Sequence, residues 1–249
     1  MELPFGYGVY AVAAVTVAAG YLVFAITGFG AALLTVPVLS HFLPLPFVLP
    51  LAVLLDVGAS LVVGVKFRRD ADWRELTWMV PSSLAGAVLG VSLLVNLPRE
   101  AALTALGVFA FAYGLYSLRA GVPVARISAA WASVSGFAGG AMGTLFGIGA
   151  PPYAIYLSRR VEDKAAMRAT LSTMVLASTG IRLTVFAIAG LVLLDRLAAW
   201  ALLFPFALAG LRAGHRIHFR MPREKVLAAI SALLIATGAS LLARVLLAN

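Results

Sequence analysis

The chain has 249 residues, of which 62% are hydrophobic and only 12% charged, and its mean hydropathy is +1.01. Because soluble domains carry about a quarter charged residues, this composition excludes a water-soluble fold. The formal charge of +9 would suit nucleic-acid binding in a soluble protein, but in a membrane protein basic loops set the topology, and we expect no nucleic-acid partner. The chain has no cysteine, which excludes disulfides and thiolate metal sites.

Eight apolar runs approach or exceed the roughly 20 residues that a helix needs to cross a bilayer. In chain order they are 7–26, 46–65, 76–95, 101–118, 127–145, 171–194, 197–211 and 226–247. They are rich in Leu, Ala and Val and lack the alternating pattern of barrel strands, so the sequence predicts an all-α, multi-pass integral membrane protein. Since no basic stretch precedes the first run, we expect that run to be a retained span.

The sequence repeats itself at a spacing of about 120 residues. Leu-Pro-Arg-Glu at 97–100 recurs as Met-Pro-Arg-Glu at 221–224, an offset of 124. Glycines and prolines match in the same order at offsets between 119 and 124: Gly20, Gly28, Gly30, Pro81, Gly86, Gly90 and Gly114 with Gly139, Gly147, Gly149, Pro205, Gly210, Gly214 and Gly238. This repetition predicts two membrane repeats, residues 1–120 and residues 125–249.

Each repeat begins with a segment that is too long for one span and is broken by glycines. The breaks are Thr-Gly-Phe-Gly at 27–30 and Phe-Gly-Ile-Gly-Ala-Pro-Pro at 146–152. We expect each segment to fold back as a hairpin, followed by three transmembrane helices. The prediction is eight full spans plus two shorter, re-entrant segments.

Five segments per repeat is an odd number, so the second repeat should be inverted. The charges of the loops agree, because the basic loops near 66–74, 159–168 and 216–225 each correspond to a loop of the other repeat that is poor in basic residues. With the basic loops in the cytoplasm, both termini are expected outside. Inverted repeats are typical of secondary transporters, which bind their cargo at the repeat interface near the midplane.

The two glycine tips, meeting near the midplane, are the predicted site for a small anion. A glycine before a helix start lets an anion approach backbone N–H groups that lack an internal partner and carry partial positive charge. For Gly86, Gly90, Gly210 and Gly214 we favour a role in close helix packing instead. The predicted substrate-binding residues are Thr27, Gly28, Phe29, Gly30, Ala31, Gly147, Ile148, Gly149, Ala150, Pro151, Ser178 and Arg182.

Two charges inside the apolar runs are further candidates, because ionisable groups within a membrane are costly. Asp56 and Ser60 lie four apart on one helix, and Ser178 and Arg182 occupy the corresponding positions of the second repeat. Arg182 could hold an anion through its guanidinium fork. Asp56 either carries a coupling proton or pairs structurally with Arg182, and the sequence leaves both readings open.

Some features receive no functional role or only a minor one. Hydroxyl groups that could add donors belong to Thr27, Thr35, Thr144, Tyr153 and Thr179, although each alone is more often a packing residue. We predict no metal site at the three histidines and expect no cofactor.

The order Gly28-x-Gly30 with Pro37 downstream, then a Gly-x-Gly-Ala-Pro motif at 147–151 with Tyr156-Leu157, resembles the sulfite exporter TauE/SafE family over essentially the whole chain. The resemblance implies a multi-pass permease of the inner membrane that exports small sulfur-containing anions, such as sulfite or organosulfonates, as a secondary transporter. The absence of a Gly-x4-Gly-Lys-Ser/Thr loop agrees with transport without ATP hydrolysis.

Two alternatives stay open: an anion channel and a membrane-embedded enzyme. The scarcity of histidines and intramembrane acids counts against the enzyme. The oligomeric state is left open.

Overall fold

The computed structural model describes residues 6–27, 30–63, 70–119, 127–217 and 223–248, and all regular structure in these ranges is helical. Its helices are α1 (Tyr7–Thr27), α2 (Ala31–Leu39), α3 (Leu45–Val63), α4 (Trp73–Asn96), α5 (Arg99–Arg119), α6 (Trp131–Phe146), α7 (Ala150–Ser158), α8 (Lys164–Ile188), α9 (Leu194–Ile217) and α10 (Arg223–Ala248). Five of them contain a stretch long and apolar enough to cross a membrane: Gly8–Ile26, Trp73–Asn96, Arg99–Leu118, Ala165–Ile188 and Leu194–Gly214. The prediction of an all-helical integral membrane protein is confirmed, and the count of eight full spans stays a prediction.

The helices break at the predicted glycines. Gly30 and Gly147 have φ angles of 101° and 77°, a left-handed conformation that glycine adopts without steric cost. The helices that follow these breaks, α2 and α7, have nine residues each. At 1.5 Å per residue such a helix is only about 14 Å long, too short to cross about 30 Å of hydrocarbon.

The chain divides into two compact units, each built from segments of both predicted repeats. Unit 1 consists of Met1–Leu55, Asn96–Ala120 and Val192–Asn249, and unit 2 of Asp56–Val95 and Gly121–Leu191. Unit 1 therefore holds α1, α2, most of α3, α5, α9 and α10. Unit 2 holds the end of α3 with α4, α6, α7 and α8. The two units are defined by contacts in space, whereas the two repeats are inferred from sequence matches. The repeats stay a prediction.

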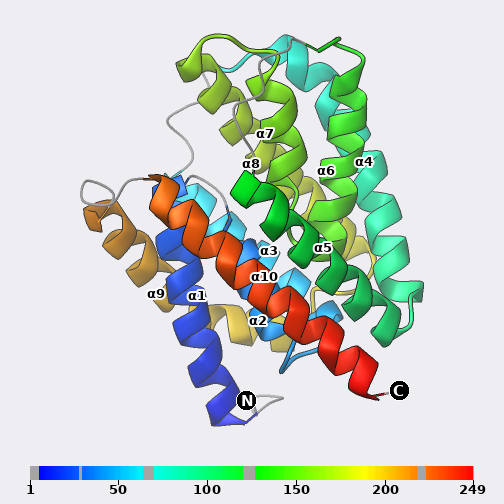
Figure 1. Ribbon diagram of the computed structural model, residues 1–249, viewed down its shortest axis with the longest axis vertical. Coiled ribbons are helices and arrows are strands. Elements are labelled where there is room, and N and C mark those ends of the chain that lie inside the picture. Colours follow the sequence, from blue (N-terminus) through cyan, green and yellow to red (C-terminus); the bar gives the residue numbers. More distant parts are fainter. Residues whose placement is uncertain (1–5, 28–29, 64–69, 120–126, 218–222, 249) are drawn as a thin grey trace. The chain divides into compact units, whose positions relative to one another are not determined.

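In unit 1, glycines bring two pairs of helices close together (Figure 1). A Cβ atom on Gly210 of α9 would collide with the carbonyl oxygen of Ala18 on α1, and one on Gly214 would lie 2.5 Å from that of Leu22. On α10, a Cβ atom on Gly238 would lie 2.8 Å from the oxygen of Gly107 on α5. These backbones can touch only because side chains are missing there.

In unit 2, glycines likewise bring the backbones of α4 and α6 close together. A Cβ atom on Gly86 of α4 would collide with the Phe137 oxygen on α6, and one on Gly90 would lie 2.8 Å from the Ala141 oxygen. The expected packing role of the four glycines on α4 and α9 is confirmed.

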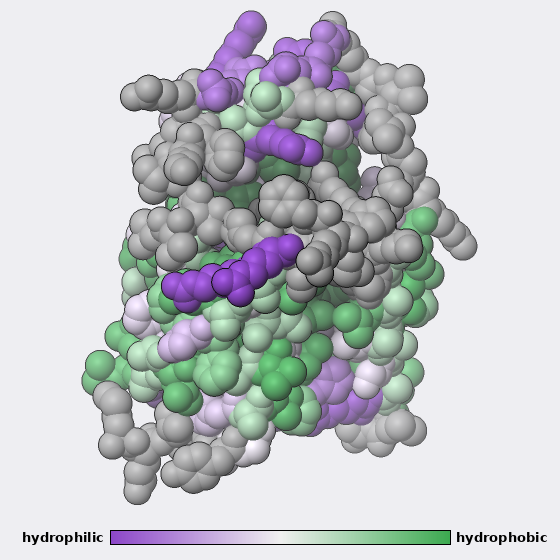
Figure 2. Space-filling model, turned by 90° about the vertical axis from the view of Figure 1, so that its left-hand side faces the viewer, coloured by the Kyte–Doolittle hydropathy of each residue, from purple (hydrophilic) through white to green (hydrophobic). Residues whose placement is uncertain are grey.

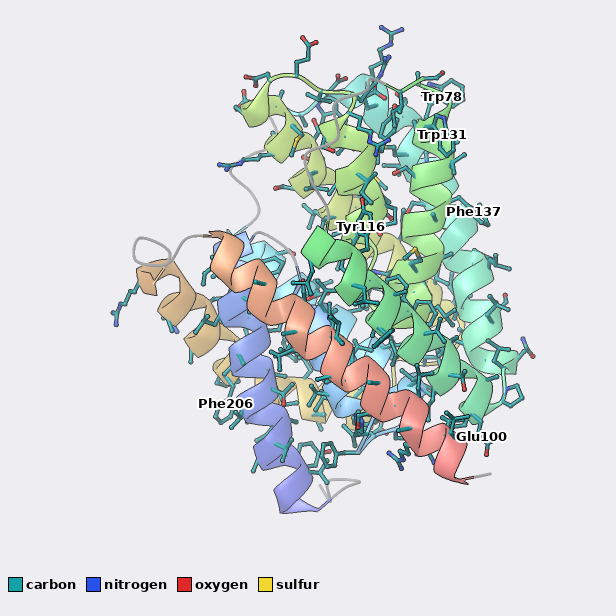
Figure 3. The ribbon with its side chains drawn as sticks, viewed as in Figure 1. Trp78, Glu100, Tyr116, Trp131, Phe137 and Phe206 are labelled. Atoms are coloured by element: carbon teal, nitrogen blue, oxygen red, sulfur yellow. The ribbon has the colours of Figure 1, made fainter. Side chains whose placement is uncertain are left out.

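The exposed side chains fit a lipid environment. Trp78 and Trp131 are 64% and 54% exposed, and Figure 3 shows them close together at the same end of α4 and α6. Figure 2 shows hydrophobic residues over much of the lower part of the face where α1 and α9 lie. Because exposed tryptophans gather at the membrane–water boundary, this end of unit 2 lies near that boundary.

Candidate functional site

The broken hairpin of unit 2 is formed by α6, a left-handed glycine and α7. The N–H of Gly147 donates to the Gly143 oxygen at 3.0 Å and closes α6. Pro151 then occupies the first turn of α7, where a missing N–H costs nothing. A Cβ atom on Gly149 would lie 2.6 Å from the Gly139 oxygen, so only glycine lets α7 begin this close to α6.

Arg182 of α8 places its guanidinium group against this hairpin. The residue is 5% exposed, and its NH1 group donates to the Gly143 oxygen at 3.0 Å. A Cβ atom on Gly143 would lie 3.3 Å from both the Arg182 Cδ and the Gly149 Cα, so Gly143 lies between the two. The structure thus brings together Arg182 and the glycines of the second predicted tip.

The remaining donors of Arg182 are only partly used. The NH2 group donates to Thr179 Oγ1 at 3.2 Å and lies 3.5 Å from Asp56 Oδ2. The buried Nε has no hydrogen-bond partner among the described residues. The contact with Asp56 is longer than the roughly 2.7–2.9 Å of a charge-assisted hydrogen bond. The ion pair that the sequence left as one alternative is therefore present, but it leaves donors for a further acceptor.

A chain of buried hydroxyl groups holds α7 in place. The Tyr153 hydroxyl lies 2.9 Å from Ser83 Oγ on α4 and 3.0 Å from Ser178 Oγ on α8. Ser135 of α6 donates to the Pro152 oxygen at 2.9 Å and fixes the first turn of α7. Ser178 and Arg182 are four residues apart, so the same face of α8 contacts both α7, at Tyr153, and the last turn of α6, at Gly143.

The first predicted tip belongs to unit 1 and is described only in part. Gly28 and Phe29 lie outside the described residues, and Thr27 ends α1 without a described side chain. Gly30 and Ala31 open α2, where Thr35 donates to the Ala31 oxygen at 3.0 Å. Gly20 of α1 makes room for this turn, since a Cβ atom there would lie 3.0 Å from the same oxygen.

A second polar cluster in unit 2 was not anticipated. Glu75 in the first turn of α4 is 6% exposed, and its Oε1 accepts from Arg160 Nε at 2.8 Å while its Oε2 accepts from the Tyr156 hydroxyl. The hydrogen bond to Glu75, and then its charge, raise the pKa of Arg160, so the guanidinium stays protonated. Glu75 lies just before the apolar run at 76–95, and no role is predicted for it. The sequence feature that could have pointed to Glu75 is an acidic residue in the first turn of a membrane span.

The fold and this hairpin define a class: a multi-pass helical membrane protein that buries an arginine beside a helix break. The family model for "Sulfite exporter TauE/SafE" matches residues 12–241. The chain is also 30% identical over 195 residues to the "Probable inner membrane transporter protein TsaS" of Comamonas testosteroni, covering 77% of this chain and 81% of that protein. No solved structure matches.

The chain therefore belongs to the sulfite exporter TauE/SafE family. It is a multi-pass transporter of the inner membrane and not an enzyme.

Proposed function

We propose that this protein is a secondary transporter that exports small sulfur-containing anions, such as sulfite or organosulfonates. The observation that carries the proposal is the buried guanidinium of Arg182, which lies against Gly143 and retains an unpartnered Nε. An unsatisfied buried donor costs about 1–3 kcal/mol, and an anionic oxygen would remove that cost. The description of the family supports both the cargo and the direction of transport.

The start of α7 adds to this site. The helix start carries partial positive charge, and its first N–H is that of Ala150, because Pro151 and Pro152 have none. A sulfonate or sulfite oxygen on the Arg182 fork is the arrangement we propose. The predicted residues of this unit are Gly147, Ile148, Gly149, Ala150, Pro151, Ser178 and Arg182.

The internal packing of each unit supports inverted repeats and alternating access. On α5, a Cβ atom of Gly114 would contact Ser231 and Ile235, while on α10 one of Gly238 would contact Gly107 and Phe111. These are the same contacts with the two helices exchanged, at an offset of 124. Residue numbers rise along α5 as they fall along α10, so these corresponding helices run antiparallel.

The contacts between α9 and α1 likewise correspond to those between α4 and α6. Gly210 faces Ala18 as Gly86 faces Phe137, at offsets of 124 and 119. Two repeats of opposite orientation, with cytoplasmic basic loops and external termini, account for both sets of contacts. We infer that rocking of the repeats exposes the anion to alternate sides.

Asp56 is our proposed coupling group. An anion that occupies the Arg182 fork competes with the carboxylate 3.5 Å away. Asp56 would then take up a proton, because the anion weakens its ion pair with Arg182 and a charged carboxylate inside a membrane is costly.

Transport of labelled sulfite or a two- to three-carbon sulfonate by purified protein in liposomes tests the proposal. We expect Arg182→Ala to slow transport at least about tenfold, because a hydrogen bond to a charged group contributes about 1.5–3 kcal/mol. Arg182→Lys, which keeps the charge but loses the fork, should be intermediate. Arg212→Ala, on the exposed surface of α9, is the matched control and should transport normally.

A proton gradient across the liposome membrane separates coupling from binding. Asp56→Asn should transport at a rate that no longer responds to that gradient. Normal transport by a folded Arg182→Ala protein would remove Arg182 from the site. A gradient response in Asp56→Asn equal to that of the unaltered protein would remove Asp56 as the coupling group.

A further inference from the structure

Among the described residues of unit 1, three buried donors have no hydrogen-bond partner. They are the Tyr10 hydroxyl, Arg196 Nε and Trp200 Nε1. Tyr10 is only 6% exposed. Each buried donor without a partner costs about 1–3 kcal/mol, and folded proteins satisfy nearly all such groups with protein, water or a bound ion. Three of them in one unit indicate an acceptor that the described residues do not supply.

The three donors belong to the same end of one helix pair. Arg196 and Trp200 are four residues apart near the start of α9 and share a face. Helix α1 runs parallel to α9, with Ala18 against Gly210. If Ala18 lies opposite Gly210, Tyr10 lies opposite the residue two positions after Trp200. Tyr10 and Trp200 are therefore about 3 Å apart in height along the helix axes.

The guanidinium group of Arg196 is held in a fixed orientation. Its NH1 group donates to Asp195 Oδ1 at 3.0 Å, and its Cζ lies 5.5 Å from the centre of the buried Phe47 ring. The side chain is 13% exposed. Asp195 and Phe47 therefore occupy one edge and one face of the guanidinium, and the Nε edge is left for an acceptor. The ion pair with Asp195 offsets part of the positive charge of Arg196.

We propose that Tyr10, Arg196 and Trp200 form a second anion site, separate from Arg182, which binds a tetrahedral oxyanion group. All three present N–H or O–H groups, and the first turn of α9 adds the partial positive charge of a helix start. The ligand is either the phosphate of an anionic lipid or a free sulfate-like anion, which share this chemistry. Tyrosine and tryptophan near the ends of membrane spans lie at the depth of lipid headgroups.

Melting temperatures of the detergent-solubilised Arg182→Gln protein test this site without relying on the proposed transport. One arm titrates sodium sulfate against sodium chloride at equal ionic strength. The other compares short-chain phosphatidylglycerol with phosphatidylcholine. We expect saturable stabilisation in one arm, and that arm identifies the source of the anion.

Conservative variants then assign the stabilisation to these residues. Tyr10→Phe and Trp200→Phe should each weaken the apparent affinity about tenfold, since each removes one hydrogen bond to a charged group. Without anion the melting temperature of Tyr10→Phe should not fall, because no existing hydrogen bond is lost. Arg196→Gln should abolish the response, and Arg212→Gln on the same helix should keep it.

Two results would overturn the proposal. One is a stabilisation by sulfate or phosphatidylglycerol that is equal in Tyr10→Phe, Trp200→Phe and the parent protein, which would reflect general exclusion or surface binding. The other is the absence of saturable stabilisation in both arms from an Arg182→Gln protein that melts cooperatively. Neither result bears on transport through Arg182.

Discussion

Glu75 links two helices of unit 2 through both oxygens of its carboxylate. In Glu75→Ala, the buried hydroxyl of Tyr156 loses its acceptor, which costs about 1–3 kcal/mol, and Arg160 loses its counter-charge. We expect the melting temperature in detergent to fall by about 4 °C or more. Glu75→Gln, which keeps an acceptor for Tyr156, should lose less.

Glu100 offers a matched control for this substitution. It is also an acid in the first turn of a span, but it is exposed on α5 (Figure 3). Glu100→Ala should change the melting temperature little, since exposed charges contribute little to stability. Equal losses in Glu75→Ala and Glu100→Ala would contradict a structural role for the Glu75 cluster.

The two buried charged sites of unit 2 differ in how far the sequence predicts them. Arg182 lies in the middle of an apolar run, where any charge needs a reason, and the structure places it beside the expected glycines. Glu75 lies at the edge of a run among loop charges, and its burial depends on Tyr156 and Arg160, which are 81 and 85 residues away. Such burial follows from tertiary packing, which a local pattern does not contain.

At the scale of elements, the contact between α4 and α6 depends on missing side chains. In Gly86→Ala the new Cβ atom would meet the backbone oxygen of Phe137, which cannot rotate away. Overpacking of this kind costs about 1–3 kcal/mol, and we expect a lower melting temperature.

Gly180 of α8 provides the opposite case. A Cβ atom there has nothing within 4 Å. Gly180→Ala should therefore leave the melting temperature unchanged or raise it. The higher helix propensity of alanine would stabilise the protein by up to about 1 kcal/mol. If Gly180→Ala lowered the melting temperature as much as Gly86→Ala, the close contact of Gly86 with Phe137 would not explain the destabilisation.

The sequence predicts helix breaks better than helix partners. Both breaks occur at the expected glycines because a left-handed φ angle is a local requirement. The sequence also indicates that Gly86 and Gly210 pack against a helix, since small residues four apart make a flat surface. Which helix each one meets is not local information, and only the structure assigns α6 to α4 and α1 to α9.

For the molecule as a whole, two descriptions divide the chain differently. Sequence repetition predicts halves 1–120 and 125–249, whereas packing gives units that each draw on both halves. The descriptions are compatible if corresponding helices exchange partners between repeats. The antiparallel contact of α5 with α10 has that form, because each helix contacts the other through corresponding positions.

The proposed inversion of the two repeats leads to a prediction about membrane sidedness. The short helices α2 and α7 correspond in the two repeats, so the residues that follow them should lie on opposite sides of the membrane. Phe42 is 50% exposed after α2, and Glu162 is exposed after α7 in the basic loop. Because the chain contains no cysteine, Phe42→Cys and Glu162→Cys each create a single thiol, and the unaltered chain is the control for background labelling.

A membrane-impermeant maleimide should label Phe42→Cys in intact cells and Glu162→Cys only after permeabilisation, because basic loops stay in the cytoplasm. Labelling of both thiols from the same side would end the inverted arrangement, whatever the cargo proves to be. Labelling from opposite sides but in the reverse order would keep the inversion and overturn the cytoplasmic assignment of the basic loops. The two outcomes separate the geometry of the repeats from their orientation, and alternating access depends on the geometry alone.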